Sequence, residues 1–243
     1  MGYWVLKAIL KPILRVAYRV RVEARANVPR SGGAIIAANH VSFLDSFFIP
    51  MAINRRKLTY LAKDDYFKSW KTAWFFKMAG QIPVDRSGGE KSERALNTGL
   101  RVLKSGELLG IYPEGTRSPD GRLHRGRTGV ARLALQAGVP VVPVGLIGTD
   151  VVMPKEAKLP RFRGGIRVQV RFGKPIDTSR FAGREDDRLA LRSLTDEIQY
   201  EIMQLSGQEY VDEYASRTAT EVLPEASRRP EDDITLSEEA LVS

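Results

Sequence analysis

A histidine and an aspartate in one short segment, His40 and Asp45, could together act as a general base. A carboxylate beside an imidazole keeps one ring nitrogen protonated and leaves the other free to accept a proton. On a continuous helix their five-residue spacing would turn the two side chains about 140° apart. The pair can therefore meet only where the chain bends between them. A structural histidine is the alternative at this point, since His-x4-Asp is common by chance.

The elements predicted around this pair favour such a bend. An apolar run at 34–38 follows Gly32 and Gly33 and predicts a short buried strand. Ser42 is a suitable N-cap for a helix that follows. The apolar residues of that helix recur at helical spacing and are Phe43, Leu44, Phe47, Phe48 and Met51. We therefore expect His40 in a strand-to-helix loop and Asp45 in the first helical turn.

A second group of residues could hold an anion. Glu114 is followed directly by Gly115, Thr116 and Arg117. Glycine lets the backbone approach a substrate closely, and arginine can hold a phosphate with a fork of donors. The alternative is a tight turn with a structural Glu–Arg ion pair.

Four sequence blocks, taken in order, resemble the glycerolipid acyltransferase family, in particular the 1-acylglycerol-3-phosphate O-acyltransferases. The blocks are 38–45, Gly80–Arg86, Tyr112–Ser118 and Val139–Val144. The resemblance covers roughly residues 20 to 210, and the segments 123–129 and 205–212 look most like actinobacterial members. The chain departs from the family pattern in two places. Tyr112 stands where phenylalanine is usual, and Arg125 to Gly129 stands where Phe-Lys-x-Gly is frequent.

The resemblance implies a role for each candidate residue. It makes His40 the base and Asp45 the group that orients it, in agreement with the physical argument above. It also implies that one block binds the glycerol phosphate of the acceptor and contributes to the oxyanion region; this block is Glu114, Gly115, Thr116 and Arg117. Two cations at predicted strand ends, Lys63 and Arg86, are placed near the same phosphate.

The implied reaction transfers a fatty acyl group from acyl-CoA or acyl carrier protein to the sn-2 hydroxyl of 1-acylglycerol 3-phosphate (lysophosphatidic acid), forming phosphatidic acid. A thioester donor is already activated, so no covalent acyl-enzyme is required. This suits a chain with no cysteine and no Gly-x-Ser-x-Gly nucleophile elbow. One alternative is an acyltransferase acting on another lysophospholipid or a glycolipid. Another is a non-catalytic membrane lipid-binding module, for which we would expect a damaged His40 or Glu114 block.

The composition excludes several kinds of site. Without cysteine there are no disulfides and no thiolate chemistry, and a metal site would need the two histidines plus carboxylates. We find no zinc-ligand spacing and no phosphate-binding glycine loop of the P-loop or Rossmann type, so we expect no metal and no cofactor. The second histidine, His124, stands in a basic loop, where we expect a solvated or capping side chain.

The net charge of +9 is unevenly distributed along the chain. Residues 216–243 hold three arginines against seven acidic residues, a net −4, which leaves +13 on residues 1–215. The strong positive charge of residues 1–215 indicates an acidic partner, which could be nucleic acid, anionic lipid or a phosphorylated substrate. Because the basic runs contain no nucleic-acid-binding module, we expect no nucleic acid partner.

The N-terminal segment is apolar but interrupted by cations at four-residue intervals, which are Lys7, Lys11, Arg15 and Arg19. On a helix these cations form a basic stripe beside a broad apolar face, a form suited to the membrane interface. Trp4 suits an interfacial anchor, and Pro12 would kink the helix. The alternative is a helix packed on its own domain. With no transmembrane stretch and no signal-peptide cleavage site, we expect a peripheral protein on the cytoplasmic face of the cell membrane.

Strands and helices alternate along the remaining chain. This alternation predicts an α/β fold with a mixed, largely parallel sheet covered by helices, preceded by the amphipathic helix. The strand ends should gather His40, Arg86 and Glu114 on one rim. The alternating segment 168–172 predicts an edge strand. We expect three parts, namely a membrane-associating helix at 1–18, an acyltransferase domain at 19–215 and an acidic, disordered tail at 216–243.

Overall fold

The computed structural model describes residues 2–84, 90–157, 159–162 and 164–215. Within these ranges it does not describe the side chains of residues 63, 65, 66, 71, 72 and 90–92. Arg86 and the predicted tail at 216–243 therefore lie outside the described residues, and so does the side chain of Lys63.

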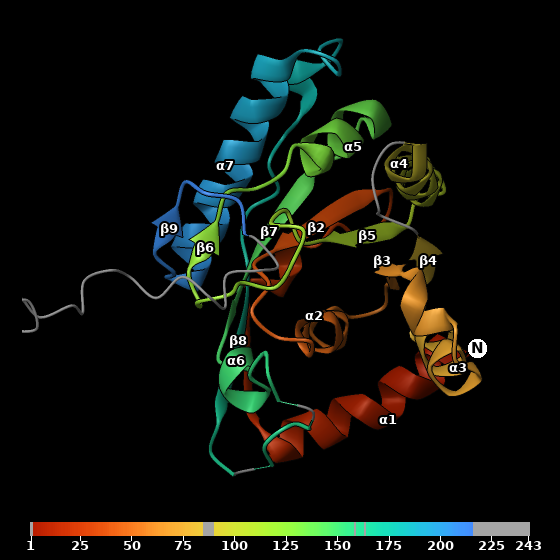
Figure 1. The fold of residues 1–243 in the computed structure, drawn as a ribbon, viewed down its shortest axis with the longest axis vertical. Helices are drawn as coiled ribbons and strands as arrows, with labels where there is room; N and C mark the ends of the chain where they lie inside the picture. Colours follow the sequence, from red (N-terminus) through yellow and green to blue (C-terminus); the bar gives the residue numbers. More distant parts are fainter. Residues whose placement is uncertain (1, 85–89, 158, 163, 216–243) are drawn as a thin grey trace, which may run out of the picture.

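The described part of the chain is built around a seven-stranded sheet in the order β1-β8-β7-β2-β5-β3-β4 (Figure 1). Its strands are β1 (Arg19–Glu23), β2 (Ala34–Ala38), β3 (Leu58–Lys63), β4 (Ile82–Val84), β5 (Leu108–Ile111), β7 (Val141–Ile147) and β8 (Arg167–Phe172). Neighbouring strands run parallel, except that β7 and β8 are antiparallel. The predicted mixed, largely parallel sheet is confirmed.

Helices cover both faces of this sheet. They are α1 (Gly2–Ala17), α2 (Asp45–Ala52), α3 (Trp70–Met78), α4 (Glu90–Lys104), α5 (Gly129–Ala137), α6 (Thr149–Val152) and α7 (Arg188–Ser206). Successive side chains of a strand point to opposite faces. In β2, Ile35 and Ala37 pack in the apolar layer under α4, α5 and α7, whereas Ile36 packs in the layer that contains Phe48 of α2. Figure 1 shows the first group of helices on one side of the sheet and α1 and α2 on the other.

The N-terminal helix α1 is bonded to the segment that follows α2. Lys7 is buried, and its Nζ donates to the Ile53 carbonyl at 2.6 Å, at the C-terminal end of α2. The Tyr3 hydroxyl accepts the Leu58 N–H at 3.2 Å, and Lys11 donates to the Asn54 side chain at 3.2 Å. Burial, aided by the neighbouring charges of Lys11 and Arg25, lowers the pKa of Lys7 to about 8. Two cations of the predicted stripe thus hold the helix on the domain.

The outward side of α1 is apolar. Its exposed large side chains are Trp4, Val5, Ile9, Ile13 and Val16. At about 100° per residue, Val5, Ile9, Ile13 and Val16 lie within about 80° of one another around the helix axis, and Trp4 lies beside this face. Among the described residues, no helix has both the length and the apolar character needed to cross a membrane.

Two sequence expectations about the elements are wrong. The strand expected at the sheet edge, β8, lies inside the sheet between β1 and β7. Its alternation arises because Val168 and Val170 face the core, whereas Arg171 faces the end of α7 and donates to the Leu205 carbonyl. The helix after His40 begins at Asp45, later than a cap at Ser42 implies.

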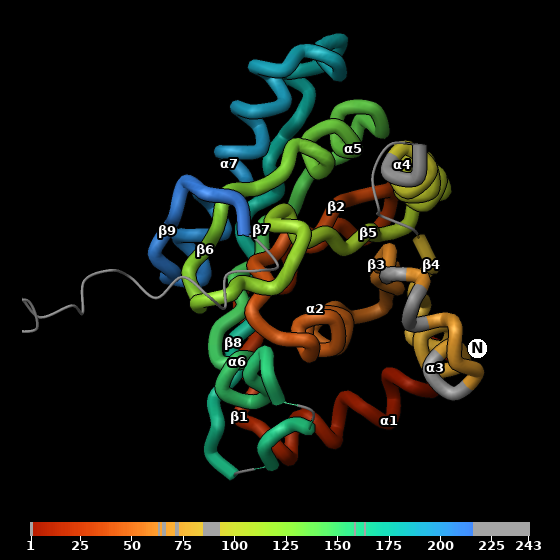
Figure 2. The backbone as a smooth tube through the Cα atoms, viewed as in Figure 1, coloured from red at the N-terminus to blue at the C-terminus, as the bar shows by residue number. Residues whose placement is uncertain are grey.

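A small two-stranded ladder was not predicted. It joins β6 (Leu123–His124) to β9 (Tyr210–Val211), two segments far apart in the sequence that lie side by side in Figure 2. It fastens the chain after α7 onto the loop that follows the Glu114 block.

Candidate active site

The candidate residues lie where three parallel strands end. Strands β2, β5 and β3 run in the same direction, so their carboxyl ends share one edge of the sheet. His40 follows β2, the block beginning at Tyr112 follows β5, and Lys63 is the last residue of β3. The structure places these positions on the rim expected from the sequence.

His40 and Asp45 are in direct contact. Nδ1 of His40 lies 2.9 Å from Oδ2 of Asp45, which is fully buried. The same oxygen accepts the backbone N–H groups of Val41 and Ser42 at 2.9 and 2.8 Å. The loop thus curls around the carboxylate, and this is the bend that the five-residue spacing requires. Ser42 contributes by donating its hydroxyl to the Met153 carbonyl at 2.8 Å.

These bonds define which nitrogen of His40 can do chemistry. A carboxylate that already accepts two N–H groups acts as an acceptor, so Nδ1 carries the proton and donates it to Asp45. Nε2 is then the basic nitrogen, and it has no hydrogen-bond partner among the described residues. With 17% of the side chain exposed, Nε2 can receive a proton from a bound hydroxyl.

Glu114 directs its carboxylate at protein groups. One oxygen accepts the His40 backbone N–H at 3.0 Å, and the other accepts that of His124 at 3.1 Å. Burial raises the pKa of Glu114 to about 7, although the two N–H groups oppose that rise. The side chain therefore ties the His40 loop to the His124 segment, and its two oxygens face these donors.

The residues after Glu114 form a tight turn close to His40. The N–H of Gly115 donates to the Tyr112 carbonyl at 3.0 Å, and Gly115 has φ +79°, which glycine adopts readily. The Ser118 N–H donates to the His40 carbonyl at 2.7 Å. Arg117 donates to the Lys155 carbonyl at 3.2 Å and makes no ion pair with Glu114 in the described part of the chain. The alternative interpretation of this block was a tight turn with a Glu114–Arg117 ion pair. The turn is present, but the ion pair is absent from the described residues.

We expected His124 to be a solvated or capping side chain in a basic loop, but it lies at the end of the short strand β6. It is buried, with Nε2 3.0 Å from Oδ1 of Asp120 and Nδ1 3.3 Å from the Glu213 carbonyl. Partial burial raises the pKa of Asp120, but the hydrogen bonds from His124 and Arg122 outweigh it and hold that pKa well below the usual range. His124 is thus a structural histidine. The Asp-x3-His spacing was the available signal.

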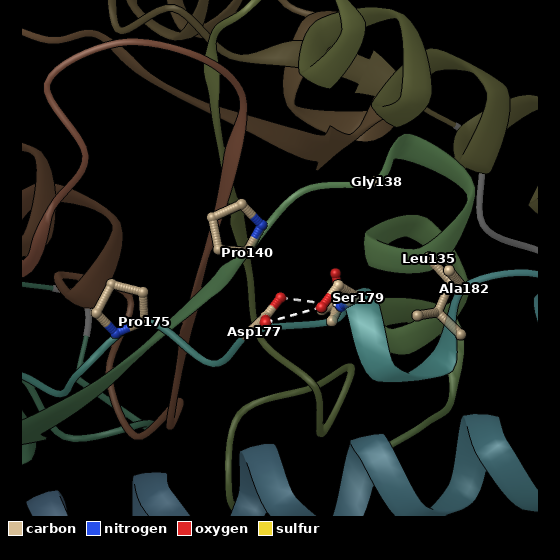
Figure 3. Close-up of a pocket in the computed structure, with 8 residues that line it drawn as sticks. Leu135, Gly138, Pro140, Pro175, Asp177, Ser179 and Ala182 are labelled. Atoms are coloured by element: carbon tan, nitrogen blue, oxygen red, sulfur yellow. Dashed lines mark hydrogen bonds between the residues drawn. The ribbon is translucent and has the colours of Figure 1, made fainter.

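A surface hollow of about 490 Å³ lies elsewhere (Figure 3). It is lined by residues around Gly138 and Pro140, just before β7, and by the segment 175–182. Because β7 runs parallel to β2, this hollow is at the opposite end of the sheet from His40. The carboxylate of Asp177 accepts hydrogen bonds from the Ser179 N–H and hydroxyl. The hollow therefore adds no residue to the candidate site around His40.

A family model described as Acyltransferase matches residues 19–147, which include the whole rim from His40 to Arg117. The chain belongs to the glycerolipid acyltransferase family. Its structure is similar to the crystal structure of the 1-acyl-sn-glycerophosphate acyltransferase PlsC from Thermotoga maritima. The two sequences are 28% identical and the TM-score is 0.61, over 81% of this chain and 79% of that chain.

Relatives with similar names occur in bacteria and plants. The 1-acyl-sn-glycerol-3-phosphate acyltransferase of Bacillus subtilis is 31% identical over 174 residues, 71% of this chain and 81% of the relative. A chloroplastic 1-acyl-sn-glycerol-3-phosphate acyltransferase of Arabidopsis thaliana is 32% identical over 164 residues, 67% of this chain. The match spans 45% of the plant protein's length.

Proposed function

We propose that this protein is a 1-acylglycerol-3-phosphate O-acyltransferase. It would transfer a fatty acyl group from acyl-CoA or acyl carrier protein to the sn-2 hydroxyl of lysophosphatidic acid. The observation that carries the proposal is the His40–Asp45 pair, with Nε2 open on the same rim as the turn at Gly115 to Arg117. The names of the bacterial and plant relatives support the same acceptor.

The geometry suggests how the residues divide the reaction. As the acceptor oxygen attacks the thioester carbonyl, Nε2 of His40 takes the hydroxyl proton, and Asp45 stabilises the imidazolium that forms. The tetrahedral intermediate then collapses with cleavage of the carbon–sulfur bond. The leaving thiolate takes the proton from Nε2, which regenerates neutral His40 and releases the thiol.

The acceptor needs an anchor for its phosphate. We assign this role to Gly115, Thr116 and Arg117, with Lys63 and Arg86 as further cations. Arg117 directly precedes Ser118, whose N–H donates to the His40 carbonyl, and arginine offers several donors to one phosphate. Glu114 would contribute by holding the His40 loop in place, since both its oxygens accept backbone N–H groups.

The membrane partner is proposed from exposed apolar residues. The face of α1 from Trp4 to Val16 is exposed, and α1 packs against α3, where Trp70 and Trp74 are 78% and 63% exposed. All three tryptophans of the chain are thus exposed on two touching helices. Tryptophan is enriched at membrane interfaces. We assign residues 1–18 to peripheral contact with the cytoplasmic face of the cell membrane and 19–215 to the acyltransferase domain.

A vesicle experiment tests that contact. Ile13→Asp, on the exposed face of α1, should weaken binding to phosphatidylglycerol vesicles by about tenfold, because it removes an apolar side chain and adds an anion. Leu189→Asp is the matched control, since Leu189 is 75% exposed on α7. Equal binding by the two variants would contradict the proposed contact.

The reaction is tested by release of free CoA. Purified protein is mixed in detergent with palmitoyl-CoA and lysophosphatidic acid, and the thiol is detected with a dye; a chain without cysteine adds no background. Release should depend on the acceptor and disappear in His40→Ala. A panel of lysophospholipids and glycolipids distinguishes other acceptors, and an acylated carrier protein, analysed by lipid product, tests the other donor. No product with any of them would favour a non-catalytic lipid-binding module.

A further inference from the structure

Three aromatic rings are stacked at the base of the rim. The Tyr112 ring lies parallel to the His40 imidazole, with centroids 3.9 Å apart and planes 9° apart. The Tyr112 ring also stacks on Tyr60, with centroids 5.5 Å apart and planes 14° apart. The His40 imidazole is therefore held in two ways, at its edge by Asp45 and across its face by Tyr112.

A glycine in the sheet makes room for this stack. Gly110 of β5 is the register partner of Tyr60 of β3. A Cβ atom on Gly110 would lie 2.3 Å from the Tyr60 ring, so any larger residue would push that ring away. Glycine inside a strand weakens the strand and often marks a close approach of another group. Here it allows Tyr60 to lie over β5 and support Tyr112.

The hydroxyl of Tyr112 reaches the helix that carries Asp45. It is 2.9 Å from the hydroxyl of Ser46, the residue after Asp45 in α2. Burial raises the pKa of Tyr112 well above its usual value, so the hydroxyl stays neutral and can share a proton with Ser46. Tyr112 thus makes two contacts. The face of its ring lies on the His40 imidazole, and its hydroxyl bonds to α2, the helix that carries Asp45.

We propose that Tyr112 is a positioning residue for the base, fixing the plane of the His40 ring and hence the direction of Nε2. Its π face also stabilises the imidazolium that forms when His40 takes the acceptor proton. The bond to Ser46 locks the Tyr112 ring in register with Asp45. This inference rests on the proposed function, because it assigns a partner to the proposed base.

Kinetics of two Tyr112 variants separate the ring from the hydroxyl. Tyr112→Leu removes the ring and should lower kcat about tenfold with little change in KM for either substrate, because a misdirected base affects the chemical step. The acid side of its pH–kcat profile should move about half a pH unit lower, since the imidazolium loses its π contact. Tyr112→Phe keeps the stack, so it should lower kcat only about threefold, the share of the lost hydroxyl, and keep the original profile.

The hydroxyl is tested by a double-mutant cycle with Ser46. Tyr112→Phe and Ser46→Ala should each lower kcat about threefold, the size of one hydrogen bond. The double variant should be no slower than either single variant, because both remove the same bond. Tyr200→Leu, on the exposed surface of α7, is the control for loss of a tyrosine ring and should keep the wild-type rate.

A spectrum reports the stack without reference to activity. The chain has two histidines, so a His124→Gln variant identifies the imidazole signals of His40. The ring protons of His40 should be shifted upfield by the Tyr112 ring, and that shift should vanish in Tyr112→Leu and return in Tyr112→Phe. An unchanged His40 spectrum and unchanged kcat in Tyr112→Leu would overturn the inference. Activity that persists in His40→Ala would instead overturn the proposed base.

Discussion

The two histidines of this chain, His40 after β2 and His124 at the end of β6, have the same kind of partner but different surroundings. His40 lies 2.9 Å from Asp45 and His124 lies 3.0 Å from Asp120. The difference is at the second ring nitrogen. Nε2 of His40 has no partner among the described residues, whereas both nitrogens of His124 are engaged and its side chain is 7% exposed. A carboxylate neighbour alone therefore does not identify a base; an accessible second nitrogen does.

We expect the largest difference in kcat between variants that remove the imidazole of His40 and of His124. His40→Ala should lower kcat by about 10³-fold with the fold retained, since general-base catalysis contributes on this scale. His124→Gln, which keeps an amide donor near Asp120, should stay within about threefold of wild type. Steady-state kinetics and thermal melting of both variants make the comparison. A similar loss of kcat in both would remove the distinction between the two histidines.

The next effect concerns Asp45, the carboxylate of the proposed catalytic pair. Asp45→Asn preserves size but removes the charge that supports the imidazolium, so kcat should fall by about 100-fold. KM should change little because Asp45 is buried and contacts the ring at Nδ1, away from the open Nε2. Far-UV circular dichroism provides the check that the loop still folds. Full activity in a folded Asp45→Asn protein would show that Asp45 serves only to shape the loop.

Glu114 accepts the backbone N–H groups of both histidines, and its raised pKa makes the stability of this connection depend on pH. Its folded-state pKa of about 7 lies above its unfolded value, so the folded state binds the extra proton and loses relative stability as pH rises from about 5 to 8. The free energy of unfolding of wild type relative to Glu114→Gln should therefore fall by about 2 kcal/mol over this range. Urea titrations at several pH values measure it. A difference that stays constant with pH would contradict the assignment.

The smallest effect concerns Asp120. Its lowered pKa means that it stabilises the fold above its unfolded pKa and that this contribution is lost as pH falls through the lower folded value. Because Asp120 is one-third exposed, solvent screening limits the loss in Asp120→Asn to about 1 kcal/mol at pH 7. Below about pH 4 the gap between the two proteins should begin to narrow, because the contribution is lost between the unfolded and the folded pKa. Denaturant unfolding at pH 7 and pH 3 tests this, and a gap that widens in acid would refute it.

The sequence predicted those parts of the fold that depend on local pattern. The apolar run at 34–38 marked the buried strand β2, and the spacing of His40 and Asp45 required the bend that the structure contains. The burial of His124 depends instead on the β6–β9 ladder, which brings residues 210–213 against a loop far away in the sequence. The contact between His40 and Tyr112 likewise requires Tyr60 to lie over Gly110 of the neighbouring strand, and no local pattern encodes that.

The bond from Lys7 to the end of α2 has a consequence for how the protein tolerates shortening. Helix α2 has eight residues and begins at Asp45. At its other end, the Ile53 carbonyl accepts a hydrogen bond from Lys7 of α1. The N-terminal segment is thus part of the frame that holds the proposed catalytic pair, as well as the face that we propose contacts lipid. A variant that begins after Ala17 would leave the Ile53 carbonyl without its ammonium donor. It would also expose to solvent the side of α2 that packs against α1. Such a chain should turn over slowly even with substrates dispersed in detergent, where no membrane has to be found.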